Sequence, residues 1–127
     1  MRRSLIVSLV ILLLVAAVGG GCEIYTGLLV RRFQSMLAQA GADAAQGRWE
    51  EAAGRVEKIS LQWEKECAWV QLWANHAETD AVRGALRGLL TSLGARDSLS
   101  SMLYYGECVE NFAHLHHRDA FTLKNIL

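Results

Sequence analysis

The chain has 127 residues, 52% of them hydrophobic, with 13 basic and 13 acidic side chains. A chain of this length suits one domain with a modest core, and its even charge balance excludes the basic footprint typical of nucleic-acid binding. It contains no proline. Since proline interrupts helices and is common in loops, its absence favours a few long helices joined by short turns.

An uncharged apolar segment opens the chain. Residues 4–22 carry no charge, and about 20 residues in a helix rise about 30 Å, the thickness of a bilayer core. Two arginines precede the segment and Glu23 follows it, which favours a cytoplasmic N-terminus and an extracytoplasmic remainder at the cell membrane. We therefore predict a single-pass anchor over residues 1–24 and a domain over residues 25–127.

Two other interpretations of the apolar segment stay open. A cleaved secretory signal has a charged start, a short apolar stretch and small residues at the cleavage site, and the glycines at 19–21 would serve as that site. A lipoprotein signal ends at a cysteine that becomes lipidated, and Cys22 stands in that position. Gly19, however, occupies the place where lipoprotein signals usually carry leucine.

The first two predicted helices follow the anchor. One covers about residues 25–45 and can continue directly from the anchor. Its apolar stripe is Leu29, Phe33, Met36, Ala40 and Ala44. The next begins near Arg48 and has the strongest periodicity in the chain. Its stripe steps by three and four through Trp49, Ala53, Val56, Ile59, Trp63, Cys67, Val70 and Trp73.

The tryptophans of this stripe, Trp49, Trp63 and Trp73, are predicted to be core residues, with ligand stacking as the alternative. Trp69 and Leu72 lie off the stripe. The end of the helix is therefore apolar on two sides, which predicts that it contacts two neighbouring helices.

Two further helices complete the domain. Asn75 is a predicted N-cap with Glu78 three residues on, and Asp97 or Ser98 can cap the last helix after Gly94. The third stripe is Val82, Leu86, Leu89, Leu90 and Leu93. The fourth is Met102, Tyr105, Val109, Phe112 and His116. The fold class is thus all-α: an N-terminal transmembrane helix followed by an up-down bundle of three to four helices, with the C-terminus returning toward the membrane.

Several short motifs carry a family resemblance. They are Trp49-Glu50-Glu51-Ala52, Trp63, Trp69, Trp73, His76-Ala77-Glu78-Thr79-Asp80, and the closing Phe121-Thr122-Leu123-Lys124-Asn125-Ile126-Leu127. Most of the chain, anchor included, resembles domain of unknown function 4363, a family of small membrane-anchored bacterial proteins. Thr79 departs from the pattern, because relatives tend to carry an aliphatic residue there. The resemblance implies an extracytoplasmic helical domain without an assigned activity, and a multi-span membrane protein as its first candidate partner.

A cluster of imidazoles and one carboxylate is the candidate metal site. His76 and Asp80 are four residues apart and share a helix face. Equal rise along antiparallel helices brings His76 level with about residue 114 or 115, near His114 and His116. Such groups can bind zinc or form a pH-sensitive cluster. The alternative is a His76–Asp80 pair at the start of its helix without a metal.

The cysteines Cys67 and Cys108 come to a similar height by the same reasoning. They form either a disulfide, in a compartment that permits one, or two separate buried thiols. The sequence has no glycine-rich phosphate loop, nucleophile elbow or evident pair of catalytic acids. We therefore expect no cofactor and no enzymatic activity.

The C-terminal tail is the candidate interaction segment. It is too apolar for a free end, which is normally polar and disordered. Its interaction residues are Phe121, Leu123, Asn125, Ile126 and Leu127. We expect a module that binds another protein at the membrane. The competing function is a small-ligand or metal binder, or a pH sensor, that uses the His/Asp cluster.

Overall fold

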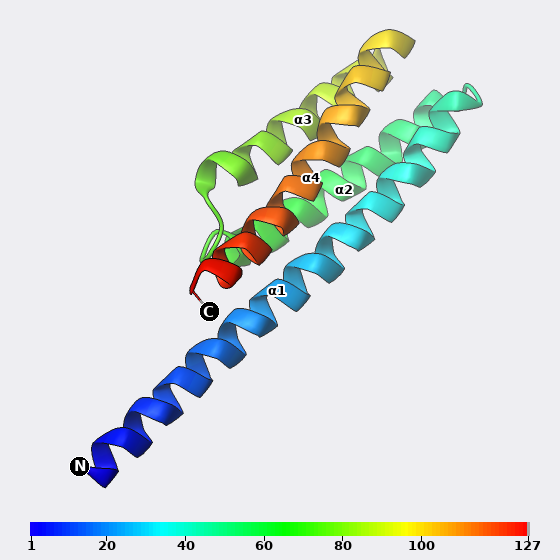
Figure 1. Ribbon diagram of the computed structural model, residues 1–127. Coiled ribbons are helices and arrows are strands. Elements are labelled where there is room, and N and C mark those ends of the chain that lie inside the picture. The colour runs from blue at the N-terminus through cyan, green and yellow to red at the C-terminus, as the bar shows by residue number, and fades with distance from the viewer. Residues whose placement is uncertain (127) are drawn as a thin grey trace.

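The computed structural model of the chain is a bundle of four α-helices in up-down order (Figure 1). It describes the backbone of residues 1–126 and the side chains of residues 1–115. The helices are α1 (Arg2–Ala45), α2 (Trp49–Val70), α3 (His76–Gly94) and α4 (Ser98–Ile126). The described part of the chain contains no strand, so the all-α prediction is confirmed.

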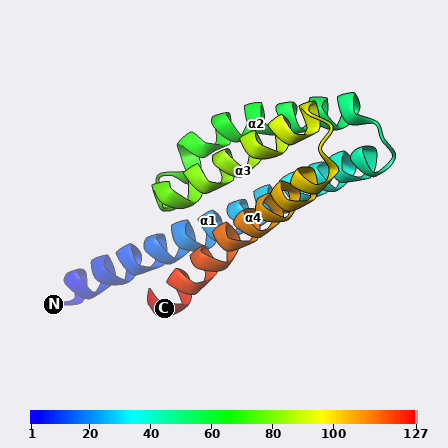
Figure 2. The same cartoon turned by 90° about the horizontal axis from the view of Figure 1, so that it is seen from above.

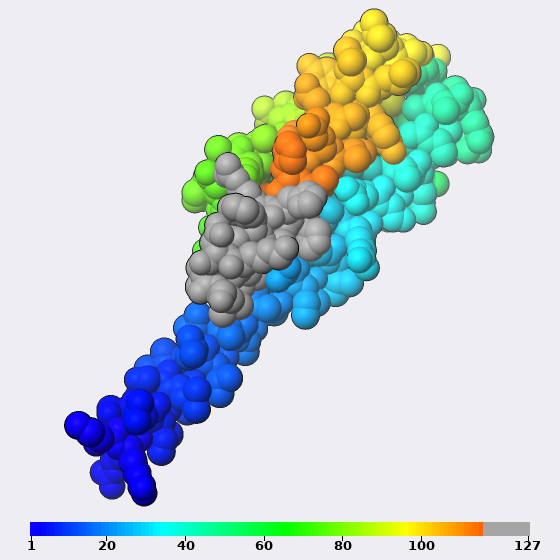
Figure 3. Space-filling view, viewed as in Figure 1, coloured from blue at the N-terminus to red at the C-terminus, as the bar shows by residue number. Residues whose placement is uncertain are grey.

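Helix α1 is one unbroken helix of 44 residues. Its N-terminal half projects from the bundle with its apolar side chains exposed (Figure 3), whereas its C-terminal half packs among the other helices. The three glycines at 19–21 do not interrupt it. By length and composition the free half suits a single membrane crossing, and an N-terminal signal sequence would share these properties.

The helices are arranged as a ring in which each contacts two neighbours. α1 packs against α2 and α4, and α3 packs against the same two helices. The turns at residues 46–48 and 95–97 lie together at one end of the bundle, here called the distal end (Figures 1 and 2). The turn at residues 71–75 lies at the opposite, proximal end, about halfway along α1 (Figure 1). Helix α4 returns toward this proximal end.

Two predicted caps start the last two helices. The Asn75 side chain accepts a hydrogen bond from the Ala77 N–H over 2.9 Å. The Asp97 carboxylate accepts the Ser100 N–H over 3.1 Å, and hydrogen bonds from Ser100 lower the pKa of Asp97. Each cap satisfies a backbone donor that has no partner within the helix.

Three aromatic rings form the centre of the core. The Phe33 and Phe112 rings stack with centroids 5.3 Å apart, and the Trp63 ring meets both edge-on at 5.9 and 5.5 Å. Trp63 is fully buried, as predicted. Trp49 and Trp73 are half-buried and pack against this core from its two ends.

The predicted stripe of α4 is partly wrong. The helix turns Ser101, Tyr105, Cys108, Phe112 and Leu115 inward. These positions step by four and three, like a regular bundle seam. Met102 is instead exposed, Val109 is half-buried, and the His116 side chain lies outside the described residues. The prediction failed because Ser101 and Cys108, which are small, occupy core positions, whereas the predicted stripe was chosen from large apolar residues.

The prediction for the end of α2 is right about its neighbours and wrong about two side chains. The helix contacts both α1 and α3, but Trp69 and Leu72 point outward, with 64% and 72% of their surface exposed. Their neighbours Cys67 and Val70 fill the interior instead. Two large apolar side chains are therefore left uncovered at the proximal end.

Candidate functional site

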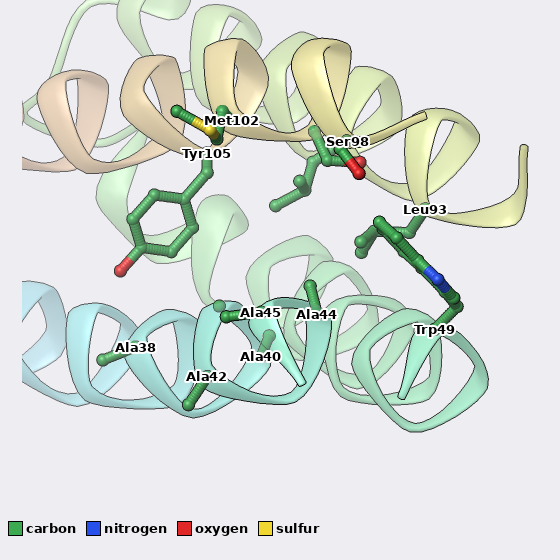
Figure 4. A pocket seen from close by; sticks show the side chains of 13 residues that line it. Ala38, Ala40, Ala42, Ala44, Ala45, Trp49, Leu93, Ser98, Met102 and Tyr105 are labelled. Atoms are coloured by element: carbon green, nitrogen blue, oxygen red, sulfur yellow. The ribbon is translucent and has the colours of Figure 1, made fainter. Parts of the chain in front are cut away.

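An apolar groove at the distal end is the candidate site. A cavity of about 440 Å³ opens there between the last turns of α1 and the first turns of α4. Figure 4 shows Tyr105 at one end of the cavity and Trp49 beside Leu93 at the other. Leu89 of α3 also lines it. We call this cavity and its rim on α1 and α4 the distal groove.

Small residues form the α1 wall of the distal groove. Ala38, Gly41, Ala42 and Ala45 recur at helical spacing and all line the cavity. Gly41 packs closely against Tyr105. A Cβ atom added at Gly41 would lie 3.0 Å from the tyrosine ring. A wall without long side chains lets another backbone approach closely.

Large apolar residues form the α4 side. Met102 lines the cavity and is also exposed to solvent at its edge. Leu99 and Leu103 are also exposed on α4, one turn apart, but neither lines the cavity. An exposed methionine at the edge of an apolar cavity is typical of adaptable binding surfaces.

One polar group inside the distal groove lacks a partner. Ser101 is only 6% exposed, lines the cavity, and its Oγ makes no hydrogen bond with the described residues. Burial of a hydroxyl without a partner costs free energy. A bound group that exchanges a hydrogen bond with this oxygen would recover that cost.

A charged cluster fixes the α1–α2 hairpin beside the groove. Buried Asp43 accepts Arg55 Nε at 2.5 Å and Arg48 Nη2 at 2.8 Å. Arg55 also donates to the Gln39 side chain over 2.9 Å. The hydrogen bond from Arg55 is the main cause that lowers the pKa of Asp43. The carboxylate thus holds the end of α1 against the start of α2 and keeps the small-residue wall in place.

The predicted His/Asp residues are not assembled into a cluster. His76 is exposed, and the Asp80 carboxylate accepts Arg83 Nη1 at 2.9 Å rather than pairing with His76. His114 Nε2 lies 3.9 Å from Glu110 on its own helix. Among the side chains of residues 1–115, no group of three or more His, Cys, Asp or Glu is placed to hold a metal ion. The side chain of His116 lies outside that range.

The cysteines are separate thiols. Cys67 and Cys108 are both buried and free, so the structure has the second of the two arrangements that the sequence allowed. The Cys67 sulfur lies 3.3 Å from Gln71 Nε2 of the α2–α3 turn and 3.9 Å from Arg83 Nη2 of α3. Burial raises the pKa of Cys67, and it raises the pKa of Cys108 to about 12. Cys22, the candidate lipidation site, is a free, half-exposed thiol in the projecting half of α1.

The predicted tail residues lie outside the described side chains. These residues are Phe121, Leu123, Asn125, Ile126 and Leu127. The periodicity of the sequence does not predict the distal groove. One signal for it is present, because the spacing of Ala38, Gly41, Ala42 and Ala45 gives α1 a face of small residues. The gap opposite that face depends on how α1 and α4 pack, which the sequence pattern does not specify.

Fold and groove define a class of protein: a small helical bundle carried on a long N-terminal helix, with an apolar groove at the end farthest from the free half of that helix. The chain belongs to the family described as domain of unknown function (DUF4363), whose model matches residues 28–126. This match confirms the resemblance and covers the bundle, leaving the apolar segment outside it. No curated protein and no solved structure matches the chain.

Proposed function

We propose that this protein is a membrane-tethered binding module without catalytic activity, whose distal groove receives an amphipathic helix of a partner protein. The free half of α1 would cross the membrane with its N-terminus in the cytoplasm. The bundle would then stand outside the membrane. The observation that carries the proposal is the open apolar cavity of about 440 Å³ with exposed Met102 at its edge.

The shape of the distal groove supports a helix as the occupant. Its two walls are helices. Small side chains line the α1 wall and large apolar side chains line the α4 wall, so a third helix can lie between them. Small residues at 38, 41, 42 and 45 allow close approach of its backbone. Met102 and Tyr105 would cover its apolar side chains. Recognition of an amphipathic helix in an apolar groove is a common binding mode.

The position of the groove supports a partner that acts away from the bilayer surface. Helix α1 rises about 30 Å between residues 25 and 45, at about 1.5 Å per residue. The distal groove therefore lies about that far beyond the end of the apolar segment. A multi-span membrane protein with an extracytoplasmic helix or loop of that reach would satisfy this geometry.

Site-specific photocrosslinking in native membranes tests the proposal. A benzophenone amino acid replaces Met102 in the full chain, and the same probe at Leu61 is the control. Leu61 has a similarly exposed apolar side chain, 63% of its surface, but lies on α2 outside the groove lining. Ala42→Trp fills the groove, and Ala81→Trp adds the same bulk at an exposed alanine of α3.

We expect a protein adduct from position 102 that persists with Ala81→Trp and disappears with Ala42→Trp. Equal adducts from positions 102 and 61 would overturn the proposal. So would an adduct that Ala42→Trp leaves unchanged, because a partner helix seated between α1 and α4 must contact that alanine.

A small amphiphilic ligand is the second candidate occupant. Ser101 favours it, because a single ligand hydroxyl or carbonyl could pair with the buried Oγ while an apolar body fills the cavity. Cavities of about 300–1,000 Å³ are usual for small molecules. Mass spectrometry of the purified full chain would then find a co-purified amphiphile, absent from Ala42→Trp, and no protein adduct would form.

A further inference from the structure

We propose that the proximal end of the bundle is seated in the interfacial layer of the bilayer, through a collar of four exposed apolar side chains: Ile24, Leu28, Trp69 and Leu72. The inference rests on the proposed membrane crossing of α1. It adds a second contact with lipid, made by the α2–α3 turn. The collar would contact the headgroups and upper acyl chains of the membrane that α1 crosses.

The α2–α3 turn is fixed at the height where the apolar segment ends. Trp73 donates its indole N–H to Thr26 Oγ1 over 3.2 Å, and its ring packs edge-on against Tyr25 at 5.9 Å. The Tyr25 hydroxyl donates in turn to the Glu66 carboxylate of α2. These contacts hold the turn beside residues 25 and 26, about one helical turn beyond Cys22, the last residue of the uncharged segment.

The side chains at this height face outward. Trp69 and Leu72 project from the end of α2, and Ile24 and Leu28 are exposed on α1. Exposed apolar side chains therefore occur both on the free half of α1 and at the adjoining end of the bundle, with Glu23 between them. Their proximity indicates one covering material for both surfaces, which is lipid if α1 crosses the membrane.

The turns at the two ends of the bundle differ in charge. Residues 67–75, which include the whole α2–α3 turn, contain no charged side chain. At the distal end, the α1–α2 turn carries Arg48 and the α3–α4 turn carries Arg96 and Asp97. An uncharged turn next to an exposed tryptophan, here Trp69 of α2, is typical of the membrane interface, where the amphipathic indole sits at headgroup level.

Seating the collar would set the depth and tilt of the domain. Interfacial tryptophans are among the anchors that fix the orientation of a spanning helix. Because α1 is continuous from the free half into the bundle, a second contact at the α2–α3 turn would restrain rotation of the whole bundle against the bilayer. The distal groove would then be presented at a fixed height.

Spin-label accessibility in pure phospholipid vesicles tests the inference. The full chain carries Cys22→Ser, while Cys67 and Cys108 are buried and free. A nitroxide is placed at Leu72→Cys or, as the matched control, at Leu61→Cys. The two leucines are 72% and 63% exposed. Leu72 lies in the α2–α3 turn and Leu61 in α2, eleven residues apart, which is about 16 Å at a helical rise. A third label at Val15→Cys reports on the crossing itself.

We expect the label at 72 to be several-fold more accessible to oxygen, which partitions into lipid, than to a water-soluble nickel chelate. The label at 61 should show the reverse. If the labels at 72 and 61 are both more accessible to the nickel chelate while the label at 15 is exposed to lipid, the proposed contact of the collar with the bilayer is wrong and the membrane crossing of α1 stands. Aqueous values at all three would instead refute the crossing. A label at 72 shielded from both reagents would mean that protein covers the collar, and would equally overturn the inference.

Discussion

The indole of Trp73 donates to Thr26 Oγ1 over 3.2 Å, and this hydrogen bond joins the α2–α3 turn to α1 just beyond the apolar segment. Thr26 is fully buried, so its hydroxyl oxygen has left water and depends on partners within the protein. The bond therefore couples the fold of the bundle to its position along the long helix.

Removing either partner of this hydrogen bond should destabilise the bundle. Trp73→Phe and Thr26→Val each leave a polar group without this partner, at a cost of about 1–3 kcal/mol. The double variant should cost less than the sum, with a coupling energy of about 1 kcal/mol. Thermal unfolding of the full chain in detergent micelles measures all three. Strict additivity would show that the bond contributes nothing.

The core prediction centres on Trp63. Its ring contacts both Phe33 and Phe112 and is fully buried, so Trp63→Ala should lower the free energy of unfolding by about 3–5 kcal/mol. Trp69→Ala removes the same side chain from an exposed site and should change it by less than about 0.5 kcal/mol in detergent. Equal losses from the two variants would contradict the burial pattern of α2.

Local chemistry made several elements predictable. The sequence predicts Asn75 as one cap and Asp97 or Ser98 as the other, because a side-chain acceptor before a helix satisfies nearby N–H groups whatever the tertiary fold. The structure has Asn75 and Asp97. Trp63 was identified because large apolar residues recur around it at helical spacing. These signals lie within one helix, so the sequence alone contains them.

Packing between helices was less predictable. In α4, Ser101 and Cys108 face the core while Met102 is exposed, and side-chain hydrophobicity predicts the reverse for Ser101 and Met102. Trp69 was expected to contact a second helix, because an apolar pattern does not distinguish a protein core from a lipid surface. The distal groove depends on the gap between α1 and α4, which arises only when both helices are in place.

Stability should fall in acid through Asp43. Ion pairs with Arg55 and Arg48 stabilise its carboxylate, and its pKa in the fold lies below the unfolded value of about 3.9. The stabilisation is therefore complete above about pH 5 and is lost as the pH falls through the lowered pKa. Melting temperatures of the parent and Asp43→Asn should differ at pH 7 and converge below about pH 4. Glu57→Gln, which changes an exposed carboxylate, is the control. If the melting temperatures of the parent and Asp43→Asn differ by the same amount at every pH, Asp43 is not the source of the acid sensitivity.

Thiol reactivity should distinguish the three cysteines. Burial raises the pKa of Cys108 to about 12 and also raises that of Cys67, so at pH 8 both remain protonated and enclosed. A maleimide should label at most Cys22 in the folded chain, and all three cysteines after unfolding without reductant. Only one labelled cysteine in the unfolded chain would indicate a disulfide and contradict the free thiols.

Two glycines of α3, four residues apart, should respond oppositely to alanine. At Gly84 an added Cβ meets nothing within 4 Å, so Gly84→Ala should stabilise the helix by up to about 1 kcal/mol. At Gly88 the same atom would overlap with the Tyr104 ring of α4. The ring must leave its place against α3, and overpacking of this kind costs about 1–3 kcal/mol. Gly88→Ala should therefore lower the melting temperature, and adding Tyr104→Ala should remove that penalty. A rise with Gly88→Ala matching that of Gly84→Ala would show that α3 and α4 are farther apart than the structure has them.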